Sequence, residues 1–443
     1  MPDFDTILHP NFLVPMIPRR EILMGHSVAI RGGQIAAILP TPDAQATDAG
    51  EHVELPGCAL MPGLINLHCH AAMSLLRGYA DDLSLTTWLQ RFIWPTESHF
   101  ISPEFVRDGS ELAIADLLMG GTTTLADQYF FPEVTAGVVD RSGLRALLTF
   151  PVIDVETAWA RDAESCINRG LALRDQYRDH DRIDIGFGPH STYMVSEGTL
   201  ARVAMLAEEL DAPVQIHLHE TRDEILASVE RSGVRPIDFL EQVGLLGPRT
   251  QCVHMAALGD QDIETVATHG AHVVHCPRSN LKLGSGICPV QKLLDRDINV
   301  ALGTDGAASN NRLSMLGELQ TASLIGKSQH GDPKAVDAWS ALEMATLHGA
   351  AALGRQDQLG SIEVGKAADL IALDLSGLQY LPRHDLASSL VYATSGNEVR
   401  WSWVAGKPLV SAGTLLTLDY NDLAERAGCW SKQLGAFRQT LES

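Results

Sequence analysis

The sequence is poor in positive charge. It has 33 Lys and Arg residues against 55 Asp and Glu residues, which gives a net charge of −22 and a pI near 5.1. No run of basic residues compensates locally for this balance. Such a surface repels a phosphate backbone and an anionic lipid leaflet alike. We therefore expect neither nucleic acid nor a membrane as a partner.

Long apolar runs and paired cysteines are also missing. No stretch reaches the ~20 apolar residues that a membrane helix needs, and no basic segment followed by an apolar one opens the sequence. The seven cysteines form an odd set without a Cys-x-x-Cys pair, which favours reduced thiols over a disulfide framework. These features predict a cytoplasmic protein.

The remaining composition is that of a globular enzyme. Hydrophobic residues make up 45% of the 443 residues and charged residues 20%, so a disordered or fibrous chain is excluded. The length allows about three domains of average size, although a single α/β barrel often takes ~250 residues.

Two kinds of secondary-structure pattern alternate along the chain. Short alternating strands broken by Gly and Pro occupy about residues 22–60, and the same pattern returns over about residues 364–418. Between them, apolar runs rich in β-branched residues alternate with helical stretches, which is typical of repeated βα units. Eight such runs occur, at residues 60–68, 123–127, 145–151, 183–189, 213–218, 251–254, 272–276 and 300–303.

Eight βα units predict an α/β fold with a (β/α)8 TIM-like barrel over residues 61–363. Residues 1–60 and 364–443 are then the two parts of a small β-sandwich domain, and the second part ends in a helix. An open doubly wound sheet is the second choice. In a barrel, the carboxyl ends of the strands meet at one face, where active sites lie.

Several of the predicted strands end in residues that bind metals. His68 and His70 end the first run, and residues at i and i+2 of a strand point to the same side. His217 ends the fifth run, His254 ends the sixth, and Asp305 follows the eighth. Such a donor set suits a borderline divalent ion, with Zn²⁺ first and Fe²⁺ or Mn²⁺ behind it.

These segments resemble the amidohydrolase superfamily in its deaminase and chlorohydrolase branch. The resemblance is carried by Met61-Pro62-Gly63-Leu64-Ile65-Asn66-Leu67-His68-Cys69-His70, by His217-x-x-Glu220, by His254, by Leu302-Gly303-Thr304-Asp305-Gly306 and by the return segment from Gly360 to Leu370. It implies that His68, His70, His217 and Asp305 bind a single Zn²⁺. Binuclear members add a bridging lysine or carboxylate from the fourth strand, but the first lysine here is Lys282.

The resemblance also implies the chemistry, which is hydrolytic deamination. Asp305 is expected to be both a metal ligand and the base that takes a proton from water. Glu220 is expected to protonate the ring and then the leaving amine, and His254 to stabilise the tetrahedral intermediate. The alternative for Glu220 is a carboxylate that caps the following helix.

Four further segments closely resemble the 5'-methylthioadenosine/S-adenosylhomocysteine deaminases. They are residues 88–97, 188–193, 279–284 and 306–311. The family implies that Glu97 holds the ribose hydroxyls, that His190 touches the purine and that Trp88 lines the pocket. A carboxylate suits a vicinal diol because it accepts two hydrogen bonds. The alternatives are an acidic helix start for Glu97 and a core role for Trp88.

One departure from that family bears on the substrate. Members that accept S-adenosylhomocysteine have arginines after the third strand, whereas Phe150 stands where one is expected, and Arg161 is the only nearby basic residue. A carboxylate beside Phe150 would be unpaired and costly, while a methylthio group would be accommodated. We therefore predict Phe150 as an apolar wall and 5'-methylthioadenosine as the preferred substrate, with S-adenosylhomocysteine or adenosine as secondary ones.

Two other functions stay open on the sequence. The chain could hydrolyse another aminated heterocycle, such as guanine, 8-oxoguanine, a pterin or an s-triazine. It could also be a catalytically silent barrel that serves as a binding subunit, although the ligand set has no gap. The resemblance further implies a homo-oligomer, either a dimer or a tetramer.

Overall fold

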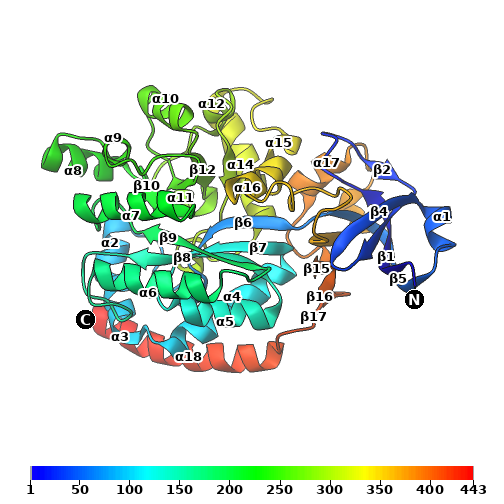
Figure 1. Ribbon diagram of the computed structural model, residues 1–443, viewed down its shortest axis with the longest axis horizontal. Coiled ribbons are helices and arrows are strands. Elements are labelled where there is room, and N and C mark those ends of the chain that lie inside the picture. The colour runs from blue at the N-terminus through cyan, green and yellow to red at the C-terminus, as the bar shows by residue number, and fades with distance from the viewer. Residues whose placement is uncertain (1, 443) are drawn as a thin grey trace.

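Strands from both ends of the chain form one mixed sheet. The computed structural model describes residues 2–442, and Figure 1 shows this sheet at one end of the molecule. Its nine strands run in the order β17-β16-β15-β14-β5-β1-β3-β4, with β2 beside β1. They are β1 (Phe4–Leu13), β2 (Leu23–Met24), β3 (His26–Arg31), β4 (Gln34–Pro40), β5 (Ala49–Pro62), β14 (Leu370–Asp374), β15 (Val399–Val404), β16 (Lys407–Ser411) and β17 (Thr414–Leu415).

The sheet curls over a core of its own. Buried residues from both halves of the sheet pack together, among them Leu8, Leu60 and Trp403. The turn after β3 reaches the turn after β15, because a Cβ added at Gly33 would lie 2.8 Å from the carbonyl oxygen of Ala405. The two ends of one continuous sheet thus face each other as the layers of a sandwich do.

Strand β1 was missed by the sequence analysis, although it pairs with both β3 and β5. Its buried residues are consecutive around Ile7 and Leu8 rather than alternating. Pro10 also lies inside it, where a proline removes a ladder hydrogen bond. The register with β5 shifts between Pro10 and Phe12, so an irregularity in the pairing accommodates the proline.

The central sheet contains eight parallel strands, as predicted. They run in the order β13-β12-β11-β10-β9-β8-β7-β6. The strands are β6 (Leu64–Cys69), β7 (Thr122–Asp127), β8 (Arg145–Val152), β9 (Ile183–Pro189), β10 (Val214–Leu218), β11 (Thr250–His254), β12 (His272–His275) and β13 (Val300–Leu302). Seven of them agree closely with the predicted runs, whereas the first run, 60–68, also took in the end of β5, which belongs to the mixed sheet. The structure therefore confirms the (β/α)8 fold class. The domain boundaries stay a prediction.

The first and last strands meet along a seam. The backbone N–H of Asp305 donates to the carbonyl oxygen of His68 at 3.0 Å. One residue earlier, the N–H of Thr304 donates to Asn66 Oδ1 at 2.9 Å. The barrel closes through these bonds, which place the segment after β13 beside the end of β6.

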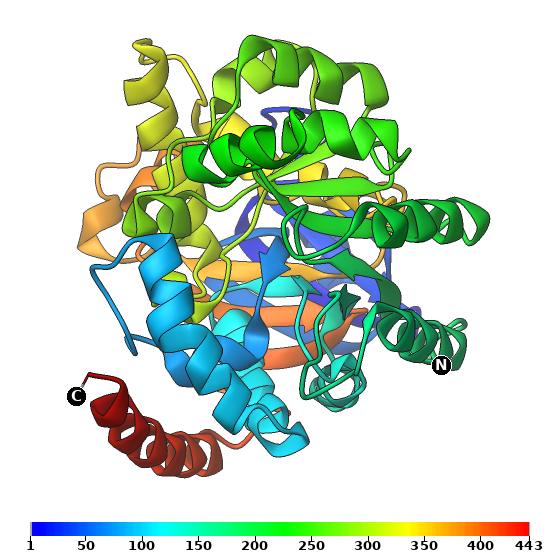
Figure 2. The ribbon, with the colours of Figure 1, turned by 90° about the vertical axis from the view of Figure 1, so that its left-hand side faces the viewer.

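Helices surround the barrel, as Figure 2 shows. The longer ones are α4 (Pro103–Met119), α5 (Pro132–Ser142), α6 (Ala163–Gln176), α7 (Glu197–Glu209), α8 (Arg222–Ser232), α10 (Asp260–His269), α14 (Met315–His330) and the terminal α18 (Tyr420–Glu442). Before α4 come α2 (Leu85–Thr87), the wide turn η2 (Trp88–Ile93) and α3 (Trp94–Phe100).

Helix α18 packs on the segment before α4. Phe100 of α3 forms edge contacts with Trp430 and Phe437, whose ring centroids lie 6.3 and 5.4 Å away. The indole N–H of Trp430 also donates to Asp108 of α4 at 2.9 Å. The C-terminal helix thereby braces α3 against the barrel.

The structure contains no disulfide within residues 2–442. Six of the seven cysteines are buried and unpaired, and Cys429 is exposed and also free. Among the same residues, no helix combines the length and the apolar character needed to cross a membrane.

The seam predicts a packing constraint at Gly303. A Cβ there would lie 2.8 Å from the Cβ of His68 and 2.9 Å from its backbone nitrogen. We expect Gly303→Ala to push the seam apart and to destabilise the fold by about 1–3 kcal/mol, as overpacking does. Thermal unfolding should show a lower Tm for this variant. Gly198→Ala is the control, because a Cβ at Gly198 has no atom within 4 Å; an equal Tm for the two variants would contradict the constraint.

Candidate active site

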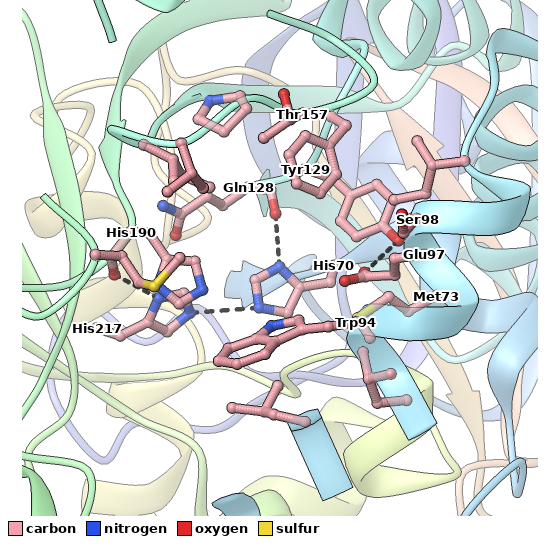
Figure 3. A pocket seen from close by; sticks show the side chains of 18 of the residues that line it. His70, Met73, Trp94, Glu97, Ser98, Gln128, Tyr129, Thr157, His190 and His217 are labelled. Carbon is pink, nitrogen blue, oxygen red and sulfur yellow. Dashed lines mark hydrogen bonds between the residues drawn. The ribbon is translucent and has the colours of Figure 1, made fainter. Parts of the chain in front are cut away.

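A cavity of about 600 Å³ opens where the barrel strands end. Its lining combines histidines from the strand ends with residues of the segment η2–α3, and Figure 3 shows part of it. The lining includes the predicted site residues His70, Trp88, Glu97, His190, His217, Glu220, His254 and Asp305.

Three histidines at this face are fixed in the same tautomer. Each ring has its Nδ1 beside a carbonyl oxygen: His68 at 2.7 Å from Gln215 Oε1, His70 at 2.6 Å from Gln128 O, and His217 at 2.8 Å from His190 O. A carbonyl oxygen can only accept a hydrogen bond, so each Nδ1 carries the hydrogen. Each Nε2 therefore carries a lone pair.

These lone pairs converge on one point together with a carboxylate. The Nε2 atoms of His70 and His217 lie 3.3 Å apart. Asp305 Oδ1 lies 3.6 Å from Nε2 of His68 and 3.5 Å from Nε2 of His70. Nε2 of His68 is buried and has no hydrogen-bond partner within residues 2–442. Lone pairs that face one another repel, and a divalent cation among them satisfies all of them, so the arrangement fits a metal ion.

His254 lies in the same cluster, but its tautomer is the opposite one. Its Nδ1 lies 3.1 Å from the amide nitrogen of Asn280, which can only donate. The hydrogen of His254 is therefore on Nε2, which lies 3.7 Å from Glu220 Oε2. His68, His217 and His254 are close enough to share an ion, but this hydrogen makes His254 a donor towards the cavity instead.

Burial keeps three of the imidazoles neutral. It lowers the pKa of His68 and of His254 to about 4, and it lowers the pKa of His217 well below its usual range. Burial alone would raise the pKa of Asp305, but the neighbouring His68 and His70 outweigh it and hold that pKa well below its usual range. Near pH 7 His68, His217 and His254 are thus neutral and Asp305 is a carboxylate, which is the state in which such groups bind metals.

Asp305 is held in place from several sides. Its Oδ2 accepts from the hydroxyls of Ser279 at 2.6 Å and Ser309 at 2.9 Å, and its Oδ1 accepts from the N–H of Gly306 at 2.7 Å. Its backbone has φ +61°, an uncommon value for a residue other than glycine. Strained backbone of this kind persists where surrounding bonds fix it, as they do here.

Glu220 is buried beside this cluster. Burial, and then the charge of Asp305, raises its pKa to about 8, although the hydroxyl of Ser285 at 3.3 Å opposes the shift. It is therefore mostly protonated at pH 7 and can donate a proton. The alternative of a helix cap is excluded, because Thr221 caps α8 by accepting from the N–H of Glu224.

The ribose-binding prediction concerns the opposite wall of the cavity. Glu97 of α3 is half-buried, and its Oε1 accepts from the Tyr129 hydroxyl at 2.7 Å (Figure 3). Burial raises the pKa of Glu97 to about 7. Trp88 is buried and its indole N–H has no partner within residues 2–442. Both residues line the cavity, as does Trp94.

Phe150 corrects one prediction. Its side chain does not line the cavity but packs under α6, where a Cβ at Gly170 would lie 2.3 Å from the Phe150 ring, and against Phe187. On β8 the neighbour Pro151 faces the cavity instead. The predicted apolar wall at Phe150 is therefore wrong. Arg161 does not line the cavity either, because its exposed side chain pairs with Asp162.

The wall beyond β8 is nevertheless free of positive charge. It consists of Pro151, Ile153, Val155 and Glu156. Within residues 2–442 no Lys or Arg lines the cavity at all. A ligand carboxylate would find no cationic partner there.

Sequence reasoning missed the residues that hold the predicted ones in place. Gln215 and Gln128 fix two imidazoles, Ser279 and Ser309 fix Asp305, and Tyr129 binds Glu97. Their partners lie far away in the sequence, so no local pattern could pair them. The available signals were the place of Gln128 and Tyr129 directly after a predicted strand and the place of Ser279 and Ser309 in the family-like segments 279–284 and 306–311.

Known proteins resemble this chain over nearly its whole length. The amidohydrolase family model matches residues 59–409. A 5-methylthioadenosine/S-adenosylhomocysteine deaminase of Teredinibacter turnerae is 49% identical over 98% of this chain and 98% of its own. A 5'-deoxyadenosine deaminase of Methanobrevibacter smithii is 39% identical over 90% and 92%. The crystal structure of a zinc-bound adenosine deaminase from Xanthomonas campestris superposes with a TM-score of 0.96, at 45% identity, over 98% of this chain and 99% of that one.

The converging lone pairs predict metal-linked stability. We expect chelator-treated protein to bind about one Zn²⁺ per chain and to gain thermal stability as the metal is added, because a ligand that binds only the folded state stabilises it. His68→Ala should abolish both effects. His272→Asn is the control, since His272 begins β12 at the opposite end of the barrel. Metal content measured by mass spectrometry that is unchanged in His68→Ala would contradict the site.

Proposed function

The chain belongs to the amidohydrolase family and, within it, to the 5-methylthioadenosine/S-adenosylhomocysteine deaminases, and we propose that its substrate is a 5'-substituted adenine nucleoside. The chain is thus a hydrolase of C–N bonds. The proposed reaction converts 5'-methylthioadenosine and water into 5'-methylthioinosine and ammonia. The observation that carries the proposal is one cavity lined by a cation-binding cluster, a protonated carboxyl at Glu220 and a second carboxylate at Glu97.

The metal is proposed to be one Zn²⁺ held by His68, His70, His217 and Asp305, with Fe²⁺ or Mn²⁺ as alternatives. Nitrogen and carboxylate donors suit all three ions, and the related adenosine deaminase contains zinc. Such an ion, when bound, lowers the pKa of a water molecule towards ~7.

The protein's own groups then move the protons. Asp305 accepts a proton from the attacking water, since serine hydroxyls and the Gly306 N–H hold its carboxylate ready. The Nε2 hydrogen of His254 donates to the oxygen that adds to the ring, which stabilises the charge that develops. Glu220 donates its proton to the ring nitrogen beside the attacked carbon, then takes the proton of the added hydroxyl and passes it to the departing amine. The proton that Asp305 took from the water then returns to Glu220, which restores both carboxyl groups.

The nucleoside is proposed to be held at three places. Glu97 accepts hydrogen bonds from the ribose hydroxyls, His190 contacts the purine, and Trp88 closes one side of the pocket. All three line the same cavity as Glu220.

The 5' group is proposed to be uncharged. The wall formed by Pro151, Ile153, Val155 and Glu156 offers a ligand carboxylate no cationic partner, and the acidic Glu156 would repel it. The preference for 5'-methylthioadenosine over S-adenosylhomocysteine therefore rests on this wall and no longer on Phe150. A cytoplasmic location, a homo-oligomeric state and the division at about residues 60 and 364 stay predictions.

A substrate panel tests the proposal. We expect the zinc-loaded protein to release ammonia with the highest kcat/KM from 5'-methylthioadenosine or 5'-deoxyadenosine, at least about tenfold above S-adenosylhomocysteine, since a carboxylate in the cavity has no cationic partner and lies near Glu156. Adenine, guanine, 8-oxoguanine and an s-triazine serve as comparisons. If a free base or the triazine has the highest kcat/KM, the nucleoside assignment is wrong. If S-adenosylhomocysteine has the highest kcat/KM, the proposed preference for an uncharged 5' group is wrong.

Glu220 gives a separate prediction. Glu220→Gln should lower kcat by about 10²–10⁴-fold, the usual contribution of a general acid or base, while metal content stays at the wild-type level. Because the protonated form is the active one, the wild-type rate should fall as the pH rises through about 8. A rate–pH profile with no decline up to pH 10, or a Glu220→Gln variant with the wild-type kcat, would show that Glu220 is not the proton donor.

A further inference from the structure

Two consecutive residues after β7 bond to two different parts of the site. The carbonyl oxygen of Gln128 accepts the Nδ1 hydrogen of His70 at 2.6 Å, and the hydroxyl of Tyr129 donates to Glu97 Oε1 at 2.7 Å. Figure 3 shows both bonds, with the rings of Tyr129 and His70 side by side. One dipeptide therefore contacts a predicted metal ligand and the predicted ribose-binding carboxylate.

This dipeptide is anchored to the barrel. The N–H of Gln128 donates to the carbonyl oxygen of Cys69 at 3.0 Å, and its side-chain amide donates to the carbonyl oxygen of Gly188 at 2.9 Å. Tyr129 is 6% exposed and packs edge-on against Phe130 at 5.4 Å. The Tyr129 hydroxyl thus has a fixed place relative to the ends of β6, β7 and β9.

Glu97, by contrast, lies on a short helix outside the barrel. Within residues 2–442 its carboxylate makes one hydrogen bond, the one from Tyr129, and no ion pair. A neutral phenol orients a carboxylate without cancelling its charge. Oε2 and the remaining lone pair of Oε1 stay free to accept from two hydroxyls.

We propose that Tyr129 is a positioning residue that determines specificity for the ribose diol by aiming Glu97 at it. This inference rests on the proposed nucleoside substrate. Tyr129 acts through Glu97 and touches no reacting atom. By fixing the carboxylate before the substrate arrives, it reduces the ordering that binding would otherwise require. Because Tyr129 directly follows β7, it also fixes the distance between Glu97 and the cation-binding cluster.

The test is Tyr129→Phe, which keeps the buried ring and removes only the hydroxyl. With adenosine we expect KM to rise about tenfold, the effect of losing a hydrogen bond to a charged group, while kcat changes less than about threefold. With 2',3'-dideoxyadenosine, which lacks both hydroxyls, kcat/KM should stay within about twofold of wild type. Zinc content and Tm, measured alongside, should match the wild-type protein.

A double-mutant cycle with Glu97→Ala, which removes the acceptor of the Tyr129 hydroxyl, separates this role from a structural one. If Tyr129 acts through Glu97, then Tyr129→Phe should cause no further loss in the Glu97→Ala background. Tyr177→Phe is the control, because Tyr177 ends α6 away from the cavity, and it should leave every constant unchanged.

Two results would overturn the inference alone. One is an equal loss on adenosine and on its dideoxy analogue in Tyr129→Phe, and the other is a full additive loss in the double variant. A wild-type enzyme that turns over free bases but not nucleosides would instead overturn the proposed function, and the inference with it.

Discussion

The convergence of lone pairs on one point is the constraint on which the rest of the site depends. Three imidazoles donate hydrogen bonds from Nδ1 to fixed carbonyl oxygens. Their Nε2 atoms therefore face one another and the carboxylate of Asp305. A folded protein tolerates such a cluster because a cation compensates it. His254, tied through Nδ1 to an amide donor, presents a hydrogen instead. The partner of Nδ1 thus decides whether each histidine presents a lone pair or a hydrogen to the cavity.

Barrel closure brings these groups together. Asp305 and His68 are far apart in the sequence, yet the N–H of one donates to the carbonyl oxygen of the other across the seam between β13 and β6. Gly303 permits this approach, since a side chain there would meet His68. The same strand ends carry Glu220, His254 and the Gln128-Tyr129 pair. The distance between the His68–His70–His217–Asp305 cluster and Glu97 is therefore set by the ends of the barrel strands.

Much of this architecture could be predicted from the sequence, because it follows from local pattern. Buried β-branched runs marked all eight barrel strands, and the i, i+2 spacing placed His68 and His70 on one side. Strand β1 was missed because Pro10 and consecutive apolar residues hide its alternation. Phe150 was predicted to line the cavity, but neighbouring residues of a strand point to opposite sides. Pro151 lines the cavity, and Phe150 therefore packs against Phe187 on the other side of β8. Partners such as Tyr129 and Glu97 could not be paired, because only the folded chain brings them into contact.

A crystal structure of the zinc-loaded protein with the product 5'-methylthioinosine tests the proposed site most directly. We expect one anomalous peak bound by His68, His70, His217 and Asp305, with both ribose hydroxyls on Glu97 and the methylthio group against Ile153 and Val155. A zinc ion bound through His254 Nε2, or a ribose that does not touch Glu97, would contradict the proposed site.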